Sequence, residues 1–404
     1  MKRYAVAGGL FLMMLITYID RAAISSAALA ISADLKFSNQ AMGGVFSAFA
    51  LGYAIAQVPG GWLADRYGPR LALALVVAVW SLFTGATGAV QGLTALLAIR
   101  FLFGVAEAGA FPGAARVVFN WLPVAERGRA NGIIFSGSRL GAAFAFPVMA
   151  LLLDARDWRT AFYLLAVPGL VWSLAWALLF RNYPAGTAPA PEVSRGSAGS
   201  FARVVRSRAM LLAMIQYFAG NFTFFICLTW MLPYLRQTYG LPQAQAARYA
   251  MLPLLIGALA HFLAGILIDI VFRSRYIAWS RRLPGALGFL IAAIGIGSLA
   301  FARSAEMAIV CFTLGAFGAE MTIAPSWAYC MDIGGENSGA VSGSMNMIGN
   351  FGSFVSANAF PFLQGLTGTA AAYFGVAAAL NVAAVLCWLR MRSVGQPQKE
   401  TVKT

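Results

Sequence analysis

The chain has 404 residues, of which 60% are hydrophobic and only 11% are charged. This composition exceeds what the surface of a soluble globular domain tolerates, so it predicts an all-α integral membrane protein. We interpret the net charge of +15 mainly as a topology signal facing anionic membrane lipid, and we expect no nucleic-acid partner.

A hydrocarbon core about 30 Å thick takes roughly 20 helical residues to cross. Apolar runs of this length predict twelve transmembrane helices, near residues 5–31, 41–65, 71–91, 94–119, 129–153, 159–180, 209–236, 245–271, 284–302, 307–331, 338–364 and 370–390. The first run is too long for a cleaved signal peptide, so we expect the N-terminus to be mature.

The only long polar interruption, residues 181–208, is rich in Pro, Gly, Ala and Ser and is predicted to be a cytoplasmic linker. It separates an N-terminal six-helix bundle (1–180) from a C-terminal one (209–392), and residues 393–404 form a cytoplasmic tail. Most Lys and Arg residues fall on the side that both termini share, which predicts cytoplasmic termini. The four cysteines lie inside apolar runs without disulfide or metal-ligand spacing.

Short motifs of the first half recur in the second half. The second span ends in "GWLADRYGPR" and the eighth in "GILIDIVFRSR", so Gly61, Leu63 and Asp65 have counterparts in the eighth span. Spans four and ten each carry an acid, Glu107 and Glu320, followed five residues later by proline. Two parallel repeats predict pseudo-symmetric bundles around a central cavity, which would serve as a transport route.

"GWLADRYGPR" resembles the cytoplasmic loop signature of the major facilitator superfamily. "YIDR" in span one, "RFLFGVAEAGAFPGA" in span four, "ERGRANG" and "GGENSGAVSGSMNMIGN" are together similar to the anion:cation symporter family. Its members are proton-coupled carriers of sugar acids, uronates and aromatic carboxylates, and in animals vesicular organic-anion carriers. The resemblance covers essentially the whole chain and implies transport by alternating access.

Span four contains Arg100 and Glu107, although a charge at the bilayer centre costs about 2.5 to 3.5 kcal/mol. Seven residues make almost two turns, so both side chains share one face, about 10 Å apart along the axis. Arg100 can bind a carboxylate in bidentate fashion, and Glu107, deeper among small residues, suits a reversible proton site. Bonds to other helices that simply hold the bundle together are the alternative.

Span one contributes Tyr18 and Arg21, which are three residues apart and share a face, while Asp20 points about 100° away. By resemblance, Asp20 and Glu107 match the proton-carrying acids of the family. Arg21 and Arg100 likewise match its substrate-binding arginines. A structural ion pair between helices remains an alternative for Asp20 and Arg21.

Tyr53 in span two matches a substrate-contact position of the family and has a hydroxyl to donate, although simple packing between helices would also explain it. In span five, Arg139 stands where related carriers often have a neutral amide. It lies ten residues beyond Arg129, about 15 Å deeper in the membrane. A third cavity arginine would suit a substrate with a second carboxylate; pairing with Glu320 or Asp20 is the alternative.

The second half supplies hydroxyl, amide and indole groups that suit a sugar acid or an aromatic ring, namely Ser326, Trp327, Asn346 and Asn350. The only histidine, His261, lies in the middle of span eight, and Glu320 is a second buried acid. A titrating His261 and a structural bond between these two residues both remain open.

Charged residues at the cytoplasmic span ends are expected to form salt bridges and helix-terminus contacts that hold a gate shut: Asp65, Arg66, Arg70, Arg116, Glu126 and Asp269. We expect them to affect conformational balance more than substrate choice.

The sequence therefore predicts a secondary active transporter of the plasma (inner) membrane. It would import an organic carboxylate, a sugar acid, aromatic acid or dicarboxylate, in symport with protons. The alternative is a proton-coupled drug or metabolite efflux antiporter, but "GSRLGAAFAFP" lacks the Gly-Pro-rich antiporter motif. The sequence carries no catalytic constellation, so we expect no enzyme activity, no cofactor and no metal. We expect a monomer, with the organic anion, protons and membrane lipid as its partners.

Overall fold

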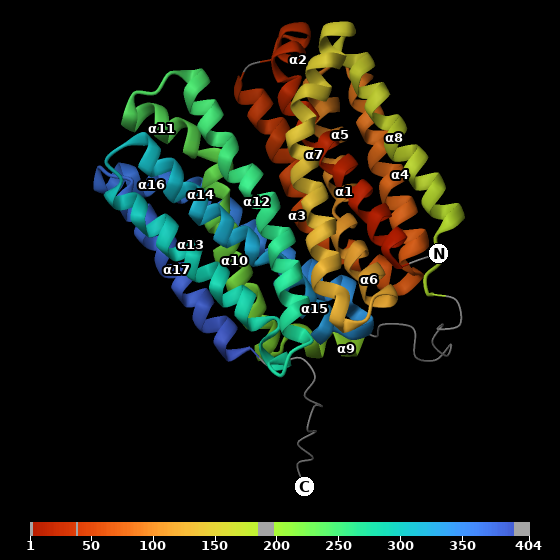
Figure 1. Cartoon of the computed structure of the whole chain (residues 1–404). Coiled ribbons are helices and arrows are strands. Elements are labelled where there is room, and N and C mark those ends of the chain that lie inside the picture. Colours follow the sequence, from red (N-terminus) through yellow and green to blue (C-terminus); the bar gives the residue numbers. More distant parts are fainter. Residues whose placement is uncertain (1–2, 38, 185–197, 392–404) are drawn as a thin grey trace.

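The computed structural model describes residues 3–37, 39–184 and 198–391, and its helices form two bundles that lie side by side (Figure 1). The first half of the chain, coloured red to yellow, builds one bundle, and the second half, green to blue, builds the other. The predicted linker contains helix α9 (Ala198–Val205). Residues 185–197 of that linker and the predicted tail, 393–404, lie outside the described residues.

The N-terminal bundle consists of apolar helices whose backbone groups bond within each helix, as hydrocarbon requires. They are α1 (Arg3–Ser26), α2 (Ala28–Leu35), α3 (Asn39–Tyr67), α4 (Pro69–Gly88), α5 (Leu93–Glu107), α6 (Ala110–Trp121), η1 (Val124–Glu126), α7 (Arg127–Ala155) and α8 (Trp158–Leu179). Helix α4 begins with proline at its first position, after Gly68 with a φ of 84°, a conformation that favours glycine.

The C-terminal bundle has the same order of long and broken helices. They are α10 (Arg208–Thr229), α11 (Met231–Tyr239), α12 (Gln243–Phe272), η2 (Ile277–Trp279), α13 (Arg282–Ser298), η3 (Leu299–Phe301), α14 (Ala305–Met321), α15 (Ile323–Gly334), η4 (Gly335–Asn337), α16 (Ser338–Thr367) and α17 (Ala371–Arg390). Nine stretches of the described chain are long and apolar enough to cross a membrane, and one of them, Ala305–Thr367, contains three α-helices and the short helix η4.

The fourth and tenth predicted spans are both broken next to a buried acid. Helix α5 ends at Glu107 and α6 begins at Ala110, while α14 ends at Met321, directly after Glu320, and α15 begins at Ile323. Pro112 and Pro325 then occupy the first turn of the second piece, where a missing N–H is tolerated. Broken helices of this kind line the cavities of transporters, because irregular backbone needs a cavity or protein around it.

The two bundles touch at the bottom of Figure 1, where the helices have the ends that lie nearest the chain termini. We call this side of the protein the terminal face. A Cβ atom on Gly61 of α3 would lie 2.3 Å from the carbonyl oxygen of Gly339 at the start of α16. A Cβ atom on Gly132 of α7 would lie 2.7 Å from the carbonyl oxygen of His261 in α12. Glycine therefore allows two helix pairs to pack backbone against backbone, and this packing closes the terminal face.

Candidate functional site

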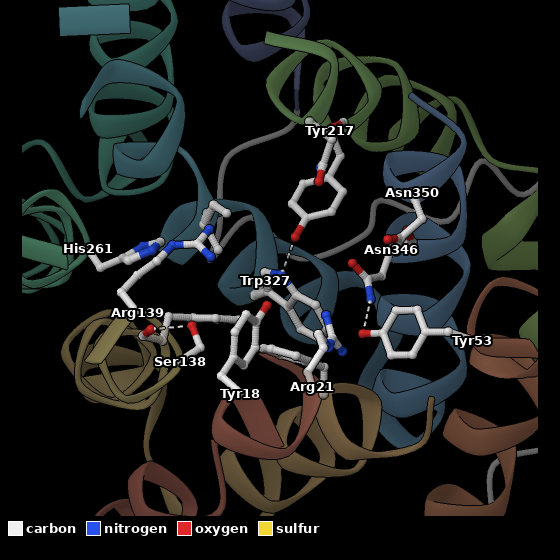
Figure 2. A pocket seen from close by; sticks show the side chains of 14 residues that line it. Tyr18, Arg21, Tyr53, Ser138, Arg139, Tyr217, His261, Trp327, Asn346 and Asn350 are labelled. Atoms are coloured by element: carbon white, nitrogen blue, oxygen red, sulfur yellow. Dashed lines mark hydrogen bonds between the residues drawn. The ribbon is translucent and has the colours of Figure 1, made fainter. Parts of the chain in front are cut away.

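A cavity lies between the bundles, and Figure 2 shows the fourteen side chains that line it. The N-terminal bundle contributes Tyr18, Arg21, Tyr53, Phe111, Phe135, Ser138 and Arg139, and the C-terminal bundle contributes Tyr217, Asn221, His261, Ile323, Trp327, Asn346 and Asn350. Both bundles thus share the site equally. These fourteen described residues include two arginines and no acid, and each arginine binds a buried glutamate that lies behind the cavity surface.

Arg21 reaches the cavity from α1 and is held from behind by Glu107, the last residue of α5. Its Nε donates to Glu107 Oε1 over 2.9 Å, and its Nη2 contacts the same oxygen. The guanidinium carbon lies 4.7 Å from the ring centroid of Tyr18 and 4.6 Å from that of Tyr53, so the two rings flank the charge. Glu107 is fully buried, and in the described part of the chain its second oxygen, Oε2, has no hydrogen-bond partner.

Arg139 of α7 forms the second charged group of the cavity and bonds across the bundles to Glu320 of α14. Its Nε lies 3.0 Å from Glu320 Oε2 and its Nη2 lies 2.5 Å from Oε1, which is the bidentate geometry of an arginine–carboxylate pair. His261 of α12 contacts Glu320 Oε2 through its Nε2. The sequence left open two structural pairs, Arg139 with Glu320 and His261 with Glu320, and both are present.

An aromatic and amide wall faces the arginines. Trp327 Nε1 donates to the hydroxyl of Tyr217 over 2.8 Å, which fixes the plane of the indole. Asn346 Nδ2 donates to Gln57 Oε1 over 2.9 Å and lies 3.5 Å from the Tyr53 hydroxyl, so it connects α16 to α3. In the view of Figure 2, Arg139 and His261 lie on one side of Trp327, and Tyr53 and Asn346 on the other.

Five of the residues singled out from the sequence do not line the cavity: Glu107 and Glu320, which bind its two arginines from behind, and Asp20, Ser326 and Arg100. Asp20 is buried inside the N-terminal bundle and accepts a hydrogen bond of 3.2 Å from Trp80 Nε1. Ser326 donates to Gln216 Oε1 over 3.1 Å within the C-terminal bundle. Arg100 is buried against aromatic rings, with its guanidinium carbon 4.6 Å from the ring centroid of Phe103, and its Nε has no hydrogen-bond partner among the described residues.

The cavity also contains residues that the sequence analysis did not select, chiefly Phe111, Phe135, Ser138 and Tyr217. Helical spacing was a usable signal for Phe135, which precedes Arg139 by four residues on α7 and so shares its face.

At the terminal face, Asp65 at the end of α3 accepts hydrogen bonds from the backbone N–H groups of Gly339 (3.0 Å) and Ala340 (2.8 Å), at the start of α16. Arg116 lies 3.8 Å from Asp65 and also binds Glu336. Asp269, near the end of α12 in the C-terminal bundle, makes a corresponding contact with the N-terminal bundle. It accepts a hydrogen bond of 3.2 Å from the backbone N–H of Arg129 on α7. Each bundle therefore caps a helix of the other bundle with a carboxylate.

A further ion-pair cluster joins the bundles beside these caps. Asp332 lies 2.7 Å from Arg127 Nη1 and 3.2 Å from Arg281 Nε, so one carboxylate binds an arginine from each bundle. Neither Asp332 nor Glu336 was predicted from the sequence, because neither belongs to a repeated motif.

The other predicted gate residues make no bond between the bundles among the interactions described. Glu126 binds Arg3 of its own bundle at 3.8 Å. Arg70 Nε donates to the carbonyl oxygen of Ala177, also within the N-terminal bundle. Arg66 is exposed.

Comparison with known proteins agrees with this architecture. The family model of the Major Facilitator Superfamily matches residues 10–357. A probable sulfoacetate transporter of Cupriavidus necator is 33% identical, over 94% of this chain and 91% of its own length. The hexuronate transporter of Bacillus subtilis is 32% identical over 94% of this chain and 92% of its own length. A probable galactarate/D-glucarate transporter of the same organism is 30% identical over 96% and 91%.

Solved structures show the same fold at low sequence identity. The transporter FucP, in an outward conformation, gives a TM-score of 0.76 at 14% identity and covers 95% of this chain and 97% of its own. The proton:xylose symporter XylE gives 0.72 at 14% identity, with 97% and 96% covered. The fold class predicted from the sequence, twelve transmembrane helices in two pseudo-symmetric bundles, is thereby confirmed. The chain belongs to the Major Facilitator Superfamily and is an integral membrane protein whose relatives are named as transporters of sugar acids and other organic anions.

Proposed function

We propose that this protein imports an organic carboxylate together with a proton by alternating access, and that a sugar acid is the substrate. The observation that carries the proposal is the Arg21–Glu107 pair: a cation on the cavity surface whose counter-ion is a fully buried carboxyl group. While Glu107 is ionised, it competes with any substrate carboxylate for Arg21. A proton on Glu107 removes this competition, so proton and substrate each favour the binding of the other.

The charge balance around Arg21 supports obligatory coupling. Asp20, Arg21, Arg100 and Glu107 are here called the Arg21 cluster. Arg100 and Glu107 interact electrostatically with each other and with both Asp20 and Arg21. When all four are ionised, the cluster is neutral. A proton alone or a monocarboxylate alone leaves one net charge, and both together restore neutrality.

A net charge in the middle of the membrane costs about 2.5 to 3.5 kcal/mol. The empty cluster and the cluster with both proton and anion are therefore the two forms favoured to pass through an occluded state. A carrier limited to these two forms is a symporter. In this scheme Glu107 is the proton site at the cavity, and Asp20 and Arg100 set the charge of the cluster from behind it.

The remaining cavity groups suit a polyhydroxylated acid. Tyr18, Tyr53, Asn346 and Asn350 offer hydroxyl and amide groups, and Trp327 offers a flat apolar surface for the face of a sugar chain. The relatives named for hexuronate and for galactarate or D-glucarate point to the same class of substrate. Efflux of cationic drugs is disfavoured, because both charged residues of the cavity lining are arginines.

The contacts of the terminal face support the proposed direction of transport. The distribution of Lys and Arg predicts that this face, with both termini, is cytoplasmic. The capping bonds of Asp65 and Asp269 lie there and close the cavity on that side. A carrier in this conformation would receive its substrate from outside the inner membrane.

Substitution of Glu107 by glutamine tests the proposal in proteoliposomes. The amide leaves the empty cluster with one positive charge, but the cluster with a bound anion is neutral. Exchange of labelled sugar acid for unlabelled acid should therefore survive, whereas uphill accumulation driven by an inward proton gradient should be lost.

Glu306→Gln, at the exposed start of α14, is the matched control and should behave like the wild type. If Glu107→Gln vesicles still concentrate the acid, the proton travels through another group, and Asp20, Glu320 and His261 would be tested in that order. Wild-type counterflow of a cationic dye without any counterflow of acids would instead establish the efflux alternative.

A further inference from the structure

Arg139 is the second arginine of the cavity lining. Its guanidinium carbon lies 6.0 Å from the ring centroid of Tyr18, and that of Arg21 lies 4.7 Å from the same centroid. The two guanidinium groups are therefore separated by no more than the sum of these distances. A molecule with two acidic groups joined by a short carbon chain is long enough to reach both.

Glu320 and Glu107 differ in whether their arginine partner belongs to the same bundle. Glu107 binds Arg21 within one bundle, whereas Glu320 of α14 crosses the interface to bind Arg139 of α7. Glu320 is fully buried and fills the fork of Arg139 with both carboxylate oxygens. It occupies Arg139 as a second substrate carboxylate would.

We propose that Arg139 is the subsite for the second acidic group of a dianionic substrate, and that Glu320 occupies this subsite as an internal substitute when no dianion is bound. This inference rests on the proposed function, since it extends the same anion site. The substrate class it favours is a diacid of short chain length, with two carboxylates or a carboxylate and a sulfonate.

The neighbours of Glu320 provide a place for the displaced carboxyl group. His261 Nε2 already contacts Glu320 Oε2, and His261 Nδ1 has no hydrogen-bond partner among the described residues. Among the described titratable groups, Tyr217 and Cys227 also interact electrostatically with Glu320, and Tyr18 and Tyr217 interact with Arg139. When a dianion takes Arg139, Glu320 can turn to His261 within its own bundle.

This exchange has two consequences. The bond from Arg139 to Glu320 joins the bundles, so its replacement by a bond to substrate removes one connection between them. The charge balance also changes, because the second anionic group adds one negative charge to a site that was neutral. A proton on Glu320, which no longer has Arg139 as its counter-ion, restores neutrality, so a diacid should bind with one more proton than the matching monoacid.

The test compares galactonate with galactarate, which share a carbon chain and differ in the second carboxylate. Dissociation constants of the purified full chain are measured for both acids over a range of pH. Arg139→Gln should weaken galactarate at least tenfold and leave galactonate within about twofold. Glu320→Gln should strengthen galactarate at least tenfold, because no internal carboxylate competes, and should remove the additional proton from its pH dependence.

Galactonate binding by each variant shows that the variant is folded, and Arg139→Lys, which keeps the charge but loses the fork, should lie between wild type and Arg139→Gln. Equal losses for both acids in Arg139→Gln, weaker galactarate binding in Glu320→Gln, or a wild type that binds galactonate but not galactarate would overturn the inference and leave the proposed function intact. A wild type that binds neither acid would instead contradict the proposed function itself.

Discussion

Replacement of Asp65 by asparagine should open the terminal face. Asp65 is 4% exposed and accepts two backbone N–H groups of α16, at 3.0 and 2.8 Å, with Arg116 at 3.8 Å. The first N–H groups of a helix have no partner within the helix, so Asp65 satisfies donors that would otherwise remain unpaired. These bonds join α3 to α16 and exist only while the bundles touch at this face.

The size of the effect follows from what asparagine keeps and loses. Its carbonyl oxygen can still accept one of the two N–H groups, but the second is left facing an NH₂ group and the negative charge is gone. Loss of a hydrogen bond to a charged group costs about 1.5 to 3 kcal/mol. The ratio of closed to open terminal faces should fall by roughly 10- to 150-fold, while substrate binding is retained and the transport cycle is slowed.

Spin labels are placed at Arg66 and Arg275, two exposed positions near this face in different bundles. Double electron–electron resonance should show the opening as a longer distance between the two labels. Asp157→Asn is the matched control. Asp157 also caps a helix, accepting from Thr160 N over 2.9 Å, but it does so within its own bundle. An unchanged distance distribution in Asp65→Asn, or an equal change in Asp157→Asn, would refute the gating role of the capping bond. Loss of substrate binding with an unchanged gate would show that Asp65 belongs to the binding site.

Two further substitutions test the packing and the anion site. Gly61→Ala should also favour the open terminal face, because its Cβ atom would lie 2.3 Å from the carbonyl oxygen of Gly339. The same labels measure this change, and Gly375→Ala, whose Cβ meets nothing within 4 Å, should leave the distances unaltered. Arg21→Lys should abolish thermal stabilisation by sugar acids while the empty protein stays folded, since lysine keeps the charge but loses the planar fork. Unchanged affinity would remove Arg21 from the site.

Helical periodicity was sufficient to predict which side chains of one helix share a face. Tyr18 and Arg21 were placed together from their spacing, and both line the cavity, whereas Asp20 points into the bundle. Periodicity does not say which helix packs against that face. Glu107 was considered together with Arg100 of its own helix, but its ion-pair partner is Arg21, which comes from α1.

The contacts between the bundles were the least predictable part. The repeated motif identified Asp65 and Asp269 as equivalent, and each accepts backbone N–H groups at the start of a helix of the other bundle, two for Asp65 and one for Asp269. Their neighbour Asp332 has no such motif, and its two arginine partners, Arg127 and Arg281, are far away in sequence. Such pairs depend on how the bundles dock, which no single helix encodes.

The two halves repeat a broken helix with a buried acid, yet they use the acid differently, and this difference follows from the arginines rather than from the repeat. Arg21 lies in the same bundle as Glu107, so their bond can persist while the bundles move, and only a proton or an anion changes it. Arg139 lies in the opposite bundle from Glu320, so their bond must break or rearrange when the bundles separate at that level. Under the proposed function, the Arg21–Glu107 pair would respond to proton and substrate in every conformation. The Arg139–Glu320 bond would couple the binding of a diacid to the separation of the bundles.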